Sequence, residues 1–265
     1  MKKVLVGIAM VALISFFSCE QEKINTSENQ KIESSAQDFL VEGNTSSTVA
    51  IISENPYDYV GEQHNIGLDA IMRKFPDGIN KENFSTGELQ TFFGEDASSE
   101  LYDTIQKYIT LEDCVRGFPN VLDLIQDPKA KECVAGILHE IRHAKFENIK
   151  EFATYINTVE KRIKDTFTLT KQDKESILSM LSVYRHSAQY WGTEYKGGYI
   201  LLWSWRNFFI TVTCDAVGAL IGGLIGSGCP VTGTVGGAIQ GGVLASALAY
   251  SLIKVVEYEE PVYVF

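Results

Sequence analysis

The fold of this chain is decided between Ala216 and Ile253, which read AVGALIGGLIGSGCPVTGTVGGAIQGGVLASALAYSLI and contain no charged residue. Glycine recurs at every fourth position in two runs, which consist of Gly218, Gly222 and Gly226 and of Gly233, Gly237 and Gly241. Residues four apart share one face of a helix, so each run forms a face without side chains that a second backbone can approach closely. Glycine costs about 1 kcal/mol per helical position relative to alanine, which favours a packing role for the repeat. The sequence therefore predicts a glycine-zipper helical hairpin over 199–256.

The surroundings of this hairpin are open to two interpretations. Each arm has about the 20 residues needed to cross a bilayer, but Asp215 and Gln240 would then face lipid or a partner. The alternative is a tightly packed hairpin in the centre of a soluble helical domain. The aromatic residues before it are typical of a membrane interface and equally of an aromatic core; they are Tyr190, Trp191, Tyr195, Tyr199, Trp203 and Trp205.

The region before the hairpin, 55–198, predicts a bundle of helices. Apolar residues recur at helical spacing, and Asn55-Pro56, Asp127-Pro128 and Thr170 are typical helix starts. After Pro128 the apolar spacing continues to Ile163, which predicts one long amphipathic helix. Alternating strand patterns are too short to build a sheet. The fold class is therefore predicted to be all-α, a helical bundle with a C-terminal hairpin.

The N-terminus has the form of an export signal. Lys2 and Lys3 precede an uncharged apolar stretch of 14 residues, Val4 to Phe17, which is short for a membrane-spanning helix. Because it ends at Ser18-Cys19, the segment resembles the lipoprotein signal peptides of Bacteroidetes. Glu20-Gln21-Glu22 is similar to the acidic stretches that mark surface export in that group. The resemblance implies a signal peptide over 1–18, a lipid such as palmitate on Cys19, and a place in the outer membrane or on the cell surface.

Two further segments complete the organisation. Residues 19–54 are rich in polar residues without apolar periodicity and predict a flexible spacer, and 257–265 predict a loose tail. The start of the body, from Asn55 to Asn65, is similar to the start of the mature domain in uncharacterised exported lipoproteins. The hairpin resembles the glycine-zipper hairpins of small outer-membrane lipoproteins and, more loosely, the apolar helices of pore-forming bacteriocins.

The charge of the chain limits its partners. With 23 basic and 34 acidic residues the net charge is −11, and loss of Lys2 and Lys3 with the signal makes it −13. Nucleic acid and anionic membrane surfaces both attract Lys and Arg, so neither is an expected partner. The expected partners are the membrane, through the lipid on Cys19, and a second copy or another envelope protein.

Four cysteines would remain after lipidation, namely Cys114, Cys133, Cys214 and Cys229. In an exported protein an even number of cysteines is compatible with disulfides. A helix from Cys214 to Gly226 would be about 18 Å long, and Cys229 lies only three residues beyond it. The Cα atoms of a disulfide lie within about 7 Å, so Cys214 and Cys229 are not expected to pair. The expected bridge is Cys114–Cys133.

A zinc-peptidase motif, HExxH, occurs at 139–143. Histidines four apart on a helix can hold one zinc ion, and the intervening glutamate can act as base on the zinc-bound water. His139 and His143 are thus candidate ligands and Glu140 a candidate catalytic base. The charged Arg142 departs from known motifs, and a third ligand could come only from Glu147, Glu160, His64 or His186. The alternative is an exposed helix face. His64 itself lies in an apolar stripe, which predicts a hydrogen-bonded core histidine.

These observations favour a non-catalytic, lipid-anchored protein of the envelope or cell surface, whose hairpin mediates helix packing, self-association or membrane contact. No cofactor is expected in that case. The main alternative is a zinc metallopeptidase that uses the HExxH motif, with zinc as its cofactor. A third hypothesis is a secreted toxin-like protein whose hairpin inserts into a target membrane.

Overall fold

The computed structural model describes residues 53–94, 99–193, 205–228 and 233–259. The predicted signal peptide, Cys19, nearly all of the spacer, Cys229 and the last residues of the tail lie outside them. Tyr195, Tyr199 and Trp203, which belong to the aromatic group before the hairpin, also lie outside the described residues.

Within the described ranges every regular element is helical, which confirms the predicted all-α fold. In chain order the elements are α2 (Asp58–Lys74), α3 (Thr86–Phe93), α4 (Ser99–Tyr108), α5 (Leu111–Arg116), the 3₁₀ helix η1 (Pro119–Leu124), α6 (Pro128–His143), α7 (Ile149–Lys164), α8 (Lys171–Thr193), α9 (Trp205–Gly226) and α10 (Gly233–Glu259). The last helix thus extends to Glu259, three residues into the segment predicted as a loose tail.

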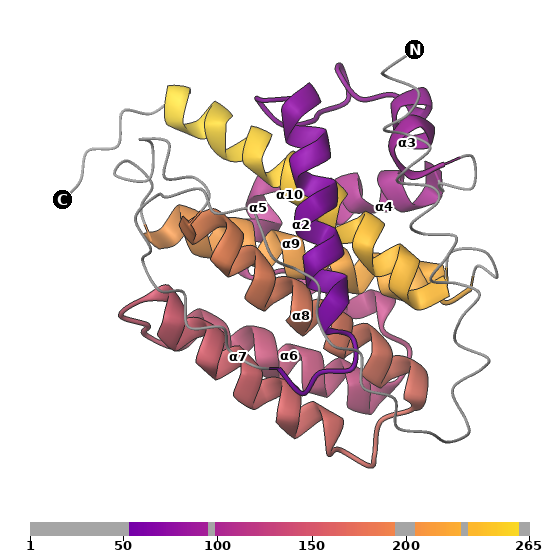
Figure 1. Cartoon of the computed structure of the whole chain (residues 1–265), viewed down its shortest axis with the longest axis vertical. Helices are drawn as coiled ribbons and strands as arrows, with labels where there is room; N and C mark the ends of the chain where they lie inside the picture. The colour runs from indigo at the N-terminus through magenta and orange to yellow at the C-terminus, as the bar shows by residue number, and fades with distance from the viewer. Residues whose placement is uncertain (1–52, 95–98, 194–204, 229–232, 260–265) are drawn as a thin grey trace, which may run out of the picture.

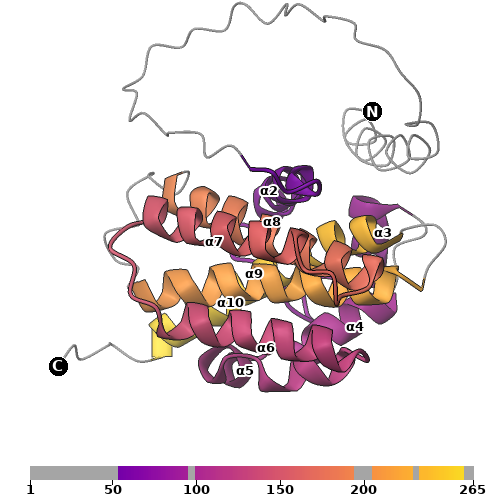
Figure 2. The same ribbon diagram turned by 90° about the horizontal axis from the view of Figure 1, so that it is seen from below.

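The predicted hairpin is formed by α9 and α10, which run through the middle of the bundle (Figures 1 and 2). Helix α9 packs against α8 on one side and against α4, α5 and η1 on the other. Helix α10 packs against α2, α8 and α4, and α7 lies along α8. The two most apolar helices are therefore surrounded by the others, of which α8 is itself buried nearly all round from residue 176 to residue 185.

The hairpin and the preceding helices share one hydrophobic core. Leu68 of α2, Ile137 of α6 and Leu181 of α8 belong to the same buried cluster as Leu220 of α9 and Leu244 of α10. The predicted segments 55–198 and 199–256 are therefore joined by packing rather than separated by a boundary. Trp191 lies in this core, 2 % exposed, and its ring stacks on Tyr250 of α10 with centroids 5.6 Å apart.

Most helix starts follow the sequence signals. The Asp127 carboxylate accepts hydrogen bonds from the backbone N–H groups of Lys129 and Ala130, and the Thr170 hydroxyl accepts one from Asp173. Asn55 behaves differently, because α2 begins three residues later. Its side-chain oxygen accepts from the N–H of Tyr57, and its amide nitrogen donates to Glu160 of α7 and to the carbonyl of Leu178 in α8. Asn55 thus attaches the start of α2 to the two neighbouring helices.

The prediction of a single long helix after Pro128 is wrong. The helical conformation is interrupted between His143 and Ile149, which gives two helices, α6 and α7. Ala144 leaves the helical conformation with ψ 148°. Asn148 then caps α7 by accepting from the N–H of Glu151, while the Glu151 carboxylate accepts from the N–H of Glu147. These two contacts end one helix and begin another although the apolar spacing continues.

Candidate functional site

The glycines of the hairpin face each other across the contact between α9 and α10. A Cβ atom on Gly222 would lie 1.9 Å from the carbonyl oxygen of Gly237, and a Cβ on Gly218 would lie 2.5 Å from that of Gly241. A Cβ on Gly226 would lie 2.3 Å from the carbonyl oxygen of Gly233. Atoms cannot approach so closely, so the two backbones meet only because these residues lack side chains. Five of the six predicted helix-packing glycines therefore lie where a Cβ would collide with the other arm, whereas a Cβ on Gly233, which contributes its carbonyl oxygen, would have no neighbour within 4 Å.

One carboxyl group is buried beside this contact. Asp215 of α9 is fully buried and accepts hydrogen bonds from the Ser187 hydroxyl and from Nε1–H of Trp191, at 2.9 Å for the latter. Burial raises the pKa of Asp215 to about 7, against the opposing effect of hydrogen bonds from Ser187, Ser246 and Trp191. Among the described residues its second oxygen, Oδ1, has no hydrogen-bond partner. Burial of the Asp215 carboxyl group at the centre of the bundle therefore costs free energy of folding.

His64 reaches the same region from α2. Its Nε2 lies 3.0 Å from the Ser246 hydroxyl of α10, and its Nδ1 lies 2.9 Å from Oδ1 of Asn65. The ring is fully buried, and burial lowers the pKa of His64 to about 4. The predicted core histidine is confirmed, and its two ring nitrogens are both engaged.

The HExxH residues lie on the exposed face of α6. His139 and His143 are side by side, with ring centroids 4.1 Å apart, and Nδ1–H of His143 donates to the carbonyl of His139 at 2.8 Å. In the part of the chain that the structure describes, none of the proposed third ligands joins them: the one group of three candidate metal ligands found there is elsewhere. His64 and Glu160 are instead buried at other contacts.

Glu140, the candidate catalytic base, is engaged between two helices. Its carboxylate accepts hydrogen bonds from the Tyr155 hydroxyl at 2.7 Å and from the Arg162 guanidinium at 2.9 Å, both on α7. The hydrogen bonds from Arg162 and then Tyr155 hold the pKa of Glu140 below its ordinary value. Glu140 thus links α6 to α7, a role that the motif alone does not indicate.

The cysteines do not form the expected bridge in this structure. Cys133 is a free thiol in α6, half-buried, near Arg162 and Glu140, and burial raises its pKa. The side chain of its expected partner, Cys114, lies outside the described residues. Cys214 is fully buried, and Cys229 lies outside the described residues.

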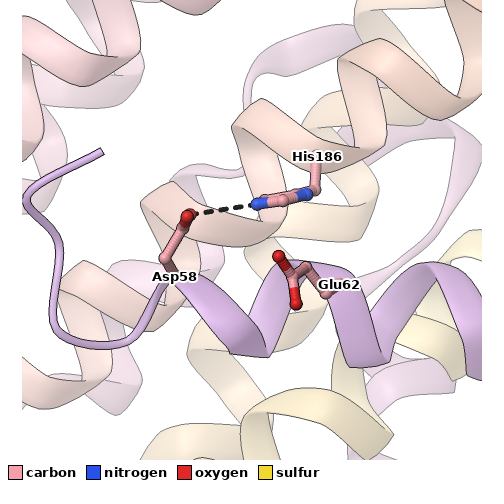
Figure 3. Close-up of side chains that lie close together, drawn as sticks. All are labelled: Asp58, Glu62 and His186. Atoms are coloured by element: carbon pink, nitrogen blue, oxygen red, sulfur yellow. Dashed lines mark hydrogen bonds and ion pairs between the residues drawn. The ribbon is translucent and has the colours of Figure 1, made fainter. Parts of the chain in front are cut away.

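Three potential metal ligands lie together where α2 crosses α8 (Figure 3). No sequence pattern indicated that all three would be neighbours. Asp58 and Glu62 are one turn apart on α2, and His186 faces them from α8. One ligand atom of each residue lies within 4.8 Å of those of the other two. Nε2 of His186 lies 3.0 Å from Oδ1 of Asp58, and since a carboxylate only accepts, the imidazole is the donor. His186 was considered before only as a partner of the HExxH pair.

The helix crossing holds two of these three side chains in place. A Cβ on Gly61 would lie 2.5 Å from Cδ2 of His186, so the backbone of α2 rests directly on the imidazole ring. Arg185, whose side chain is 2 % exposed, forms ion pairs with Asp58 and with the buried Glu160. Burial lowers the pKa of His186 to about 4, an effect that Arg185 increases and Glu62 opposes. The imidazole is therefore neutral at pH 7.

Both hairpin helices are long and apolar enough to cross a membrane, over Asn207–Gly226 and Gly233–Lys254. In this structure most of each segment is buried against other parts of the chain. Length and composition of this kind occur in membrane spans and in the core helices of soluble domains alike.

No protein-family model matches the chain, and neither a curated protein nor a solved structure matches it significantly. The proposals that follow therefore depend on contacts among the described residues.

Proposed function

We propose that this chain is a non-catalytic protein of the outer membrane or cell surface, anchored by a lipid on Cys19, in which the glycine-zipper hairpin holds the helical domain together. The observation that supports this role is the mutual contact of Gly218, Gly222 and Gly226 with the glycines of α10. Close packing of helix backbones is what such a repeat provides, and here each glycine face is filled by the other arm. Neither a second copy nor lipid can reach these faces unless α9 and α10 separate.

The surrounding helices support the same proposal. Amphipathic helices α2 and α4 cover the hairpin with apolar side chains and leave their polar faces outside, as expected of a domain surrounded by water. The domain would then stand away from the membrane at the end of the predicted spacer, and only the lipid on Cys19 would enter the bilayer.

The peptidase alternative receives less support from the geometry. A zinc peptidase needs three protein ligands and a glutamate free to act on the metal-bound water. His139 and His143 lack a third ligand among the described residues, and Glu140 is occupied by Arg162 and Tyr155. Breaking this ion pair would have to precede any role of Glu140 as a base.

Partitioning between water and detergent tests the buried state of the hairpin. Residues 20–265 contain every described helix and core side chain but lack the lipid-bearing cysteine. At pH 7.5 this protein is expected to remain in the aqueous phase as a monomer and to leave dye-loaded liposomes intact. Recovery in the detergent phase, or dye release, would contradict the proposal and favour a membrane-inserting hairpin.

The anchor is tested separately in cells. The full-length chain and its Cys19→Ser variant would be expressed in a bacterial host that lipidates exported proteins, supplied with a palmitate analogue. We expect the label on the wild-type chain and its loss from the variant. Equal labelling of both chains, or of neither, would contradict lipidation at Cys19 without affecting the proposal for the hairpin.

A further inference from the structure

We propose that Asp58, Glu62 and His186 form a binding site for a divalent transition-metal ion at the crossing of α2 and α8. One imidazole nitrogen and two carboxylate oxygens are a donor set typical of Zn²⁺ sites in which three protein ligands leave a position for water. Figure 3 shows the three side chains converging from the two helices, and each offers an atom within 4.8 Å of the others. The site is independent of the lipid anchor and of the HExxH motif.

The distances suit a shared ion. Two ligands bound to one ion at about 2.0–2.2 Å lie roughly 3.0–3.5 Å apart. Nε2 of His186 and Oδ1 of Asp58 are 3.0 Å apart, so these two atoms already have the required separation. Glu62 lies one turn along α2 from Asp58 and is exposed, so a change of side-chain rotamer can bring its carboxylate to the same ion.

The site combines two fixed ligands with one mobile ligand. The backbone at Gly61 supports the His186 ring, and the Arg185 guanidinium pairs with Oδ1 of Asp58, the same oxygen that faces His186. Supporting contacts of this kind orient metal ligands and lower the cost of binding. The side chains of His186 and Asp58 are 13 % and 33 % exposed, so an ion can reach them and water can complete its coordination.

The charges around the crossing also favour a cation. The Arg185 guanidinium is shared between Asp58 and the buried Glu160, which offsets its charge. Glu62 has no hydrogen-bond or ion-pair partner among the described residues, and its carboxylate lies within 4.8 Å of Asp58. A divalent ion would neutralise these two carboxylates together.

Binding would change the tautomer of the His186 ring. In the structure Nε2–H of His186 donates to Asp58, and an imidazole coordinates a metal only through a nitrogen without a proton. The ion would take the place of this proton, and since the neutral ring carries only one N–H, the proton would move by way of solvent to Nδ1, with no net loss from the ring. Because the ligands come from two helices, the ion would also join α2 to α8 and stabilise the folded state.

Titration with Co²⁺ and Zn²⁺ tests the site. Residues 20–265, freed of metal with a chelator, would be titrated with Co²⁺ while the visible absorption is recorded, and with Zn²⁺ in a calorimeter. We expect one ion per chain and a higher thermal midpoint with Zn²⁺. Glu62→Gln is expected to weaken binding at least about tenfold, and His186→Gln to abolish it.

The matched control is the double variant His139→Ala, His143→Ala, which removes the other histidine pair and is expected to bind as the wild type does. Glu62 is exposed, so its variant keeps the fold, and circular dichroism would verify this for each protein. Binding that survives Glu62→Gln and His186→Gln but is lost in the double variant would place the ion at HExxH and overturn the proposal. Equal binding by all variants, or none by the wild type, would overturn it as well.

Discussion

Replacing Asp215 by asparagine is expected to stabilise the protein at pH 8 much more than at pH 5. In the folded state burial raises the pKa of Asp215 from 3.8 to about 7. The folded protein therefore binds this proton more tightly than the unfolded chain does. The contribution of Asp215 to stability is fully present below pH 3.8 and is lost as the pH rises through 7.

The magnitude follows from the shift of the pKa. Each pKa unit corresponds to about 1.4 kcal/mol, so relative to a residue that does not ionise, Asp215 destabilises the fold by about 4 kcal/mol at pH 8, and by about 1.5 kcal/mol at pH 5, where folding requires the uptake of a proton. Asparagine has the same shape, can accept the hydrogen bonds from Ser187 and Trp191, and does not ionise. The stability of Asp215→Asn relative to the wild type should therefore increase by about 2–3 kcal/mol between these two pH values.

Urea unfolding of both proteins at several pH values, followed by circular dichroism, measures this difference. His64 and His186 titrate over part of the same range, but they are present in both proteins and cancel in the comparison. A difference in unfolding free energy that is constant with pH, or that decreases as the pH rises, would refute the assignment of a raised pKa to Asp215.

Three further predictions concern other contacts. Gly61→Ala should lower the free energy of unfolding by about 1–3 kcal/mol in urea, since its Cβ would collide with His186, whereas Gly87→Ala, with only a distant neighbour, should not lower it. Glu140→Gln should change stability by less than about 1 kcal/mol in the same assay, because its ion pair with Arg162 is exposed, and a larger loss would contradict the surface role. The fully buried thiol of Cys214 should react with a maleimide only after unfolding, and mass spectrometry of native protein that finds it labelled would contradict its burial.

The features that local sequence patterns specify were predictable. Asp127 and Thr170 start helices because their side chains satisfy backbone N–H groups a few residues away. The glycine repeat predicted a hairpin because it too is a local pattern. A spacing of four residues is enough to put the glycines on one face of each helix. The break between α6 and α7 was missed, although Asn148 and Glu151 gave a capping signal that could have revealed it.

The features that depend on distant residues were not predictable. An apolar helix satisfies the same requirements in a membrane and in a protein core, so the sequence left the surroundings of α9 and α10 open. The cluster at the helix crossing joins Asp58 and Glu62 to His186, more than a hundred residues later in the chain, and no local motif connects them. Only their i, i+4 spacing on α2 indicated a shared face.

The contact between the two glycine faces is tested most directly by comparing Gly222→Ala with Gly136→Ala in residues 20–265. A Cβ on Gly222 would lie 1.9 Å from the Gly237 carbonyl oxygen, whereas a Cβ on Gly136 in α6 has no neighbour within 4 Å. Gly222→Ala is expected to lower the free energy of unfolding in urea by about 1–3 kcal/mol, and Gly136→Ala to raise it by up to about 1 kcal/mol. If both substitutions stabilise the protein equally, α9 and α10 are not packed through their glycines, and the account of the hairpin as the core of the domain is contradicted.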